Sequence, residues 1–223
     1  VLAVVAGAQL AQLCKHEGIT VLGVRGGRPP SVRSVERAIA DLAAAKVTVL
    51  AGGVELTRIA ERAAELAVQG GGDVVVIPCA SPVQVLAALA VHDAERRTAD
   101  NVVAMAEAAA ATRRGELTLA GEDAMTWVGR ANAGDVVGFV DDEVVMIAPG
   151  SEPSARLLAG AAATLLDLML SAGGELVTVL LGAGAPDGIG EALAEHMTRA
   201  HPEVELAVYP GGHGESVLSL GVE

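Results

Sequence analysis

Aromatic residues are the scarcest class in this chain of 223 residues, at 1% of the sequence. Only Trp127, Phe139 and Tyr209 carry aromatic rings, although 52% of the residues are hydrophobic. That apolar content excludes a disordered or collagen-like chain, and the length suffices for one large core or two smaller ones. The core must be filled by Ala, Val and Leu, which suits helices packed closely on a parallel sheet.

Cysteines are also few, and long apolar runs are missing. Cys14 and Cys79 lie within or beside apolar segments, so we expect no structural disulfide framework, and a cytoplasmic location fits best. No apolar run reaches the roughly 18 residues that span a bilayer, so we expect no transmembrane segment, and no basic segment precedes a cleavable signal. Because the chain opens on Val1, we expect it to be a fragment of a longer protein.

Positive charge is in short supply. The chain has 15 Lys and Arg against 28 Asp and Glu, a formal net charge of −13, and no basic cluster. Such a surface repels phosphate backbones and anionic membranes, which argues against nucleic acid as a partner. Acidity mostly serves solubility, although an acidic face can also steer a basic partner protein.

The first part of the chain alternates buried strands with amphipathic helices, a β-α-β series that predicts a parallel sheet. Strands are expected at Val1–Ala6, Thr20–Val24, Lys46–Ala51 and Asp73–Pro78, and helices at Gln9–Glu17, Val32–Ala43 and Val54–Val68. Ser81 and Pro82 then open a helix through Ala90. Asp100 is expected to cap a further helix to about Arg113, which Gly115 ends.

We place a domain boundary near Gly115, giving a first α/β lobe over 1–115 and a second over 116–223. The second lobe begins with antiparallel hairpins, whose turns are predicted at Gly134-Asp135 and Asp141-Asp142. Helices and strands then alternate again, so its sheet should be mixed. The expected strands are Glu116–Ala120, Val136–Val140, Val144–Ala148, Leu176–Leu181, Glu205–Tyr209 and Val217–Val222, and the expected helices are Pro153–Ser171 and Gly190–Ala200.

Motifs that would carry chemistry are hard to find. Glycines follow strands at Gly26-Gly27, Gly52-Gly53 and Gly182–Gly190, but none of these loops fits a P-loop or a dinucleotide fingerprint. No two of the histidines have the i, i+4 spacing of a zinc-binding helix, so we expect no metal site. The five histidines are His16, His92, His196, His201 and His213.

The loop from Gly211 to Ser216 combines an imidazole, a carboxylate and a hydroxyl, which could support acid-base or nucleophilic chemistry. Three groups so close in sequence rarely converge on one point, however, and a glycine-rich turn before the last strand needs no catalytic explanation. We therefore expect no catalytic residue.

Several short phrases occur in a shared order along nearly the whole chain. They are Gly26-Gly27 with Pro30-Ser31, Ala60–Ala64, Ile77-Pro78 with Gln84–Ala88, Asn101–Ala108, Arg114–Thr118, Gly134-Asp135 with Gly138, Leu176–Thr178 with Gly182, and Tyr209–Gly212 leading to Gly221–Glu223. In this order they resemble the C-terminal region of the bacterial fatty acid kinase family, which is related to dihydroxyacetone kinase.

The resemblance implies an α/β fold of the DegV and dihydroxyacetone kinase type, with two lobes, a parallel-rich sheet in the first and a mixed sheet in the second. It also implies that ATP and Mg²⁺ belong to a separate N-terminal kinase domain of the same polypeptide, so no cofactor is expected in this chain. The chain itself is expected to dock a DegV-like fatty-acid-binding carrier, whose acyl carboxylate that kinase domain phosphorylates. Homodimerisation is left open.

Loops at strand ends should form the docking contact, because connecting loops carry binding while the sheet supplies rigidity. The expected binding residues are Gly26, Gly27, Arg28, Ser31, Gly52, Gly53, Gly211, Gly212, His213 and Ser216.

Four loops depart from the family pattern and lose polar side chains: Gly7–Gln9, Arg28-Pro29, Gly52–Glu55 and Gly211–Gly214. These departures indicate a divergent member, with a different partner or acyl group. The alternative is the substrate domain of a dihydroxyacetone kinase-like enzyme, in which His213 would bind a small ketone covalently.

Overall fold

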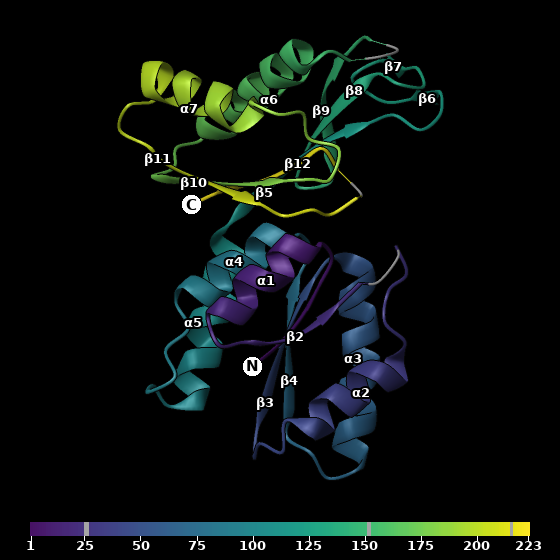
Figure 1. Ribbon diagram of the computed structural model, residues 1–223, viewed down its shortest axis with the longest axis vertical. Helices are drawn as coiled ribbons and strands as arrows, with labels where there is room; N and C mark the ends of the chain where they lie inside the picture. Colours follow the sequence, from purple (N-terminus) through teal and green to yellow (C-terminus); the bar gives the residue numbers. More distant parts are fainter. Residues whose placement is uncertain (25–26, 151–152, 215) are drawn as a thin grey trace. The chain divides into compact units, whose positions relative to one another are not determined.

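Two separate sheets organise the chain in the computed structural model, which describes residues 1–24, 27–150, 153–214 and 216–223 (Figure 1). The chain divides into two units, Val1–Thr112 and Arg113–Glu223, each with its own apolar core. The sequence had placed this division near Gly115, a residue that lies within a strand of the second unit. The predicted α/β fold, parallel in its first part and mixed in its second, is confirmed.

The first unit is a parallel sheet of order β2-β1-β3-β4 with helices on both faces. Figure 1 shows α2 and α3 on one face and α1, α4 and α5 on the other. The central strands β1 and β3 are buried along their whole length, which is why they are continuous apolar runs. The elements are β1 (Leu2–Val5), α1 (Ala8–His16), β2 (Thr20–Gly23), α2 (Val32–Asp41), β3 (Val47–Gly52), α3 (Val54–Gln69), β4 (Val74–Cys79), α4 (Pro82–Ala90) and α5 (Thr98–Ala111).

The second unit is a six-stranded mixed sheet of order β11-β10-β12-β5-β8-β9, in which only β10 and β11 pair in parallel. Helices α6 and α7 lie on one face and enclose its core (Figure 1). The elements are β5 (Arg113–Leu119), β6 (Ala124–Met125), β7 (Arg130–Ala131), β8 (Val136–Val140), β9 (Glu143–Ala148), α6 (Ala155–Leu170), β10 (Leu176–Leu181), α7 (Ile189–Ala200), β11 (Glu205–Pro210) and β12 (Leu218–Val222).

The turn between β8 and β9 confirms the predicted hairpin. Asp141 and Asp142 both have positive φ angles, 47° and 70°, as the two central residues of a type I′ turn require. Arg114 of β5 holds this turn, because its guanidinium pairs with the Asp142 carboxylate at 2.5 Å.

The predicted start and end of α5 were wrong. The helix begins at Thr98 after Arg97, and Asp100 lies in its first turn, where its carboxylate pairs with Arg97 at 3.2 Å instead of capping. A carboxylate at that position is favourable because it faces the positive end of the helix dipole. The helix ends at Ala111, since Arg113 and Arg114 join β5 and pair with β12. Gly115 is therefore inside a strand, and its missing Cβ leaves room for the Met169 sulfur.

Within the residues that the structure describes, no helix combines the length and the apolar character needed to cross a bilayer.

Gly182, directly after β10, offers a test of this packing. A Cβ at this position would overlap the backbone carbonyl oxygen of Ser216, whereas a Cβ at Gly184 would meet nothing within 4 Å. We expect Gly182→Ala to lower the free energy of unfolding by about 1–3 kcal/mol, because backbone cannot yield as a flexible side chain would. Gly184→Ala should leave it unchanged or raise it by less than about 1 kcal/mol. Urea unfolding of both variants measures this, and equal midpoints would contradict the expected clash.

Candidate functional site

The loops after β2 and β3 are the first region in which the sequence predicted binding. Gly27 has a left-handed backbone, with φ of 70°, and Arg28 beside it is exposed. Ser31 caps α2, because its Oγ accepts a hydrogen bond from the Ser34 backbone at 3.2 Å. Gly26 lies outside the described residues. This loop thus presents one cation to solvent, while its serine is already used by the helix.

Gly52 and Gly53 have a packing role at the end of β3. A Cβ on Gly52 would come within 3.1 Å of the Val85 side chain, so the glycine allows α4 to approach the sheet. The backbone N–H of Gly53 donates to the Cys79 carbonyl at 2.8 Å and is therefore not free for a ligand.

Gln84 also ties this edge of the sheet together. Its Oε1 accepts from the backbone of Ala80 at 2.8 Å, and its Nε2 donates to the Ala109 carbonyl at 3.0 Å. The side chain thereby joins the start of α4 to the end of α5.

The loop from Gly211 to Ser216 is mostly buried in the second unit. His213 is 4% exposed and Ser216 is 7% exposed. His213 Nε2 lies 2.9 Å from Ser216 Oγ and 3.1 Å from Ser219 Oγ, and the two hydroxyls are 3.2 Å apart. The expectation that these groups would not converge was therefore wrong for His213 and Ser216. Ser219, on β12, was missed because it belongs to a segment that had seemed purely structural.

Burial lowers the pKa of His213, so the imidazole is neutral at neutral pH. Its Nδ1 has no hydrogen-bond partner among the residues described. A Cβ on Gly211 would approach this Nδ1 to 2.8 Å, so the glycine is what allows the ring to lie there. The predicted alternative, in which His213 attacks a ketone, would need an accessible ring nitrogen, whereas Nε2 already faces two hydroxyls. The geometry therefore favours a buried polar cluster that fixes the loop.

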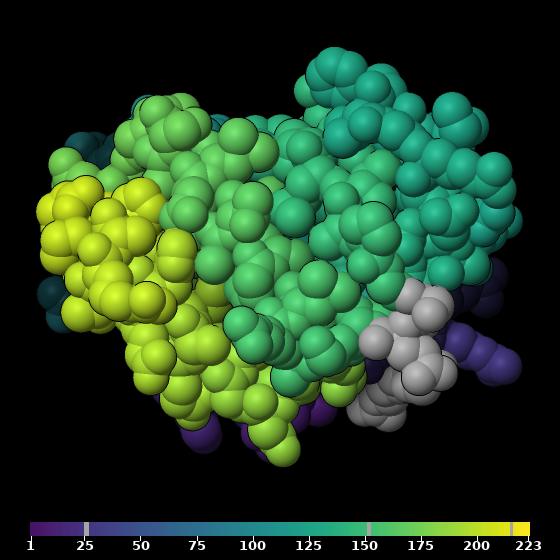
Figure 2. Space-filling model, turned by 90° about the horizontal axis from the view of Figure 1, so that it is seen from above, coloured from purple at the N-terminus to yellow at the C-terminus, as the bar shows by residue number. Residues whose placement is uncertain are grey.

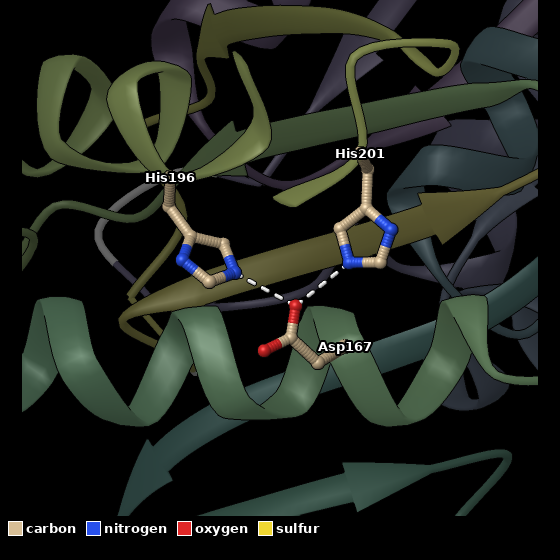
Figure 3. A group of neighbouring side chains, drawn as sticks. All are labelled: Asp167, His196 and His201. Atoms are coloured by element: carbon tan, nitrogen blue, oxygen red, sulfur yellow. Dashed lines mark hydrogen bonds and ion pairs between the residues drawn. The ribbon is translucent and has the colours of Figure 1, made fainter. Parts of the chain in front are cut away.

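A second polar cluster was missed by the sequence. Asp167 of α6 lies between His196 of α7 and His201, the residue after that helix (Figure 3). Its Oδ1 is 2.7 Å from His196 Nε2 and 2.8 Å from His201 Nε2. Partial burial acts to raise the pKa of Asp167, but the hydrogen bonds and charges of the two histidines outweigh it, so the pKa is lowered.

The spacing of these histidines explains why sequence reasoning failed. Residues five apart on an ideal helix point about 140° away from each other. The helix ends at Ala200, and His201 has a non-helical backbone with φ of −138° and ψ of 60°. This change of direction brings its ring toward the same carboxylate. A carboxylate on a preceding helix was the only available signal, and nothing in the local sequence marks it.

The third feature is the β6–β7 hairpin, which exposes the only tryptophan of the chain. Trp127 is 79% exposed and Met125 is 80% exposed, with Val128 beside them at 44%. We call these three side chains the hairpin tip. In the space-filling view the teal part of the chain, which includes this hairpin, projects at one edge of the face shown (Figure 2). Large apolar side chains grouped on a surface mark sites of interaction.

Hydrogen bonds at its base fix the conformation of the hairpin. Asp123 accepts from the Ala133 backbone at 2.9 Å and pairs with Arg130 at 2.7 Å, and these two contacts lower the pKa of its carboxyl. Thr126 and Gly129 close the turn through reciprocal backbone bonds of 2.9 and 3.2 Å. The tip is therefore presented by a hydrogen-bonded turn.

Acidic charge is concentrated in the unit that carries the hairpin. Of the 28 acidic and 15 basic side chains of the chain, residues 113–223 hold 17 and 5, and residues 1–112 hold 11 and 10. Nearly all of the formal net charge of −13 therefore belongs to the second unit.

Comparison with solved structures places the chain among DegV-type and dihydroxyacetone kinase-type folds. A DegV family protein from Eubacterium eligens loaded with heptadecanoic acid matches with a TM-score of 0.68 at 12% identity, over 100% of this chain and 99% of that one. The fatty acid kinase B3 protein of Streptococcus pneumoniae loaded with linoleic acid matches with 0.67 at 13% identity, over 100% and 99%. Dihydroxyacetone kinase from C. freundii matches with 0.68 at 14% identity, over 100% of this chain and 48% of that one. These identities establish the fold alone.

Sequence comparison identifies the family. An uncharacterised protein of Staphylococcus aureus strain USA300 is 24% identical over 208 residues, which cover 92% of this chain but 36% of that protein. The protein of strain MRSA252 matches with the same identity and coverage. The chain thus spans about a third of the length of these curated relatives. The model of the FakA-like C-terminal family of fatty acid kinases matches residues 1–223, and the chain belongs to that family.

Proposed function

We propose that this chain is the recognition module of a fatty acid kinase, and that it docks a DegV-like fatty-acid-binding carrier. The acyl carboxylate of the carrier is then phosphorylated by a separate kinase domain of the same polypeptide, which supplies ATP and Mg²⁺. Membership of the FakA-like C-terminal family supports this role, and so does the coverage of only 36% of the relatives' length.

The observation that carries the proposal is the exposed Trp127. In a chain with three aromatic residues, none belongs to the buried core, and the largest is 79% exposed on a turn. Tryptophan is the residue most enriched among those that dominate binding energy at protein interfaces. Leaving it in water has no benefit for folding, so its placement favours a role in binding.

The hairpin tip suits docking because it is ordered before a partner arrives. The Asp123–Arg130 pair and the Thr126–Gly129 turn fix the backbone on both sides of Trp127. Ordering of loops and side chains on association costs free energy, and a turn that is already closed avoids part of that cost. Among the predicted docking residues, His213 and Ser216 are buried, so the hairpin is the better placed surface in this unit.

Charge indicates the chemistry of the partner. The 17 acidic and 5 basic side chains of residues 113–223 favour approach by a positively charged surface. We therefore propose that the carrier presents an apolar pocket for Trp127 within a rim of Lys and Arg. Exposed charges of this kind mainly raise the rate of association and select the partner, while the apolar anchor provides most of the affinity.

Truncating the anchor tests the proposal. We expect Trp127→Ala to weaken binding of the organism's DegV-like carrier at least about tenfold, since central tryptophans commonly cost about 2 kcal/mol or more. Because the side chain is exposed, the free energy of unfolding should change by less than about 0.5 kcal/mol. Calorimetric titration of carrier into each variant measures the affinity. The matched control is Val103→Ala, an exposed apolar residue on α5 at 56% exposure, which should bind as the unchanged chain does. Equal affinities for all three proteins would remove the hairpin from the interface.

Salt gives an independent test of the charge argument. Raising ionic strength from about 0.01 M to about 1 M shortens the screening length from roughly 30 Å to 3 Å. We expect the association rate to fall by at least about tenfold over this range and the dissociation rate to change little, as for other steered complexes. Surface plasmon resonance resolves the two rates. An association rate that does not respond to salt would show that the acidic unit has no part in recognition.

A further inference from the structure

The cluster of Asp167, His196 and His201 unites three potential metal ligands from two helices. One carboxylate oxygen and two imidazole nitrogens all lie within 4.8 Å of one another. Figure 3 shows both rings directed at the same oxygen from different sides, and the ring planes meet at 62°. Most surface histidines have no such arrangement, because it requires two separate elements to aim their side chains at one point.

We propose that these three side chains bind a divalent first-row transition metal ion, Zn²⁺ in particular. Two neutral imidazoles and one carboxylate are the ligand types that zinc, copper and nickel prefer, whereas calcium and magnesium prefer sites made of oxygen alone. Three protein ligands would leave a fourth tetrahedral position for water. The site is separate from the hairpin and does not depend on the proposed docking.

The distances are compatible with entry of an ion after a small adjustment. Tetrahedral ligands at about 2.0–2.1 Å from zinc are about 3.3 Å from one another. The two nitrogen–oxygen distances are now 2.7 and 2.8 Å, so each must open by about half an ångström. The side chains have room for this, since Asp167 is 46% exposed and the histidines are 23% and 22% exposed.

Electrostatics also favours a cation. The lowered pKa of Asp167 keeps its carboxylate ionised at neutral pH, and the metal would replace the protons that both Nε2 atoms now direct at it. Metal binding would therefore release protons, as it does wherever ligands must deprotonate.

The structural consequence would be a cross-link between α6 and the end of α7. These helices cover the core of the second unit, which includes Leu166 of α6 and Leu193 of α7. An ion that binds only the folded state stabilises it according to its concentration relative to the dissociation constant. Zinc at about one hundred times that constant would favour the folded form by about 2.7 kcal/mol, roughly a hundredfold shift in the unfolding equilibrium.

The experiment uses the full chain without a histidine tag, freed of metal by dialysis against chelator. Zn²⁺ alone is titrated by calorimetry, Co²⁺ is followed by its visible absorption, and thermal unfolding is recorded with and without Zn²⁺. We expect one saturable site, a cobalt spectrum typical of low coordination number, and a higher unfolding temperature with zinc. Mg²⁺ should produce none of these effects.

Three variants assign the ligands. His196→Ala, His201→Ala and Asp167→Asn should each weaken zinc binding at least about tenfold, because even changes behind the ligands cost about ten- to hundredfold. His16→Ala removes an exposed histidine of α1 and is the matched control, with unchanged affinity expected. Asp167→Asn keeps the shape of the side chain, so its loss of binding cannot be attributed to unfolding if its circular dichroism is unchanged. Absence of saturable zinc binding in the unchanged chain, or equal binding in all three variants, would overturn the proposal and leave a hydrogen-bonded clamp.

Discussion

Close approach of helices to sheets through small side chains is the constraint on which the rest of this structure depends. Ala60 and Ala63 of α3 and Ala162 of α6 are fully or almost fully buried where those helices meet their cores. Gly138 of β8 goes further, because a Cβ there would come within 2.5 Å of the Met146 side chain. Interiors packed this tightly have few voids and leave no room for aromatic rings. The scarcity of aromatics and the exposure of Trp127 are therefore two sides of one design.

A scaffold of this kind separates stability from recognition. The polar groups that might have formed an active site are instead satisfied internally, as His213 Nε2 is by Ser216 and Ser219 and as Gln84 is by the backbone around it. What remains free to meet a partner is a hydrogen-bonded hairpin inserted between two strands of an acidic unit. Neither element of the hairpin is part of the large sheet, so its side chains can change without disturbing the core. This division fits a chain whose family is defined by one end of a fatty acid kinase protein.

Hydrophobic periodicity predicted most of the regular elements because burial alone specifies them. The four strands of the first unit and helices such as α2 and α4 follow directly from apolar spacing and from the Ser81-Pro82 start signal. The β6–β7 hairpin could not be predicted in this way, since its strands have only two residues each and mostly face solvent. The start of α5 was misplaced because Asp100 suits the first turn of a helix as well as the cap.

The polar sites were harder to predict than the elements that carry them. The groups that converge at His213 come from a loop and a strand only a few residues apart, and only the fold around Gly182 and Gly211 brings them together. The meeting of Asp167 with His196 and His201 depends on a change of backbone direction at the end of α7. Such encounters arise from tertiary structure, and no local pattern of residues encodes them.

Amide hydrogen exchange, measured on the chain alone and on the chain saturated with its DegV-like carrier, tests the central claim most directly. We predict slowed exchange concentrated in residues 120–135, the segment that contains the hairpin, with little change in the buried strands that are already protected. Unchanged exchange throughout residues 120–135 in the presence of bound carrier would contradict the account.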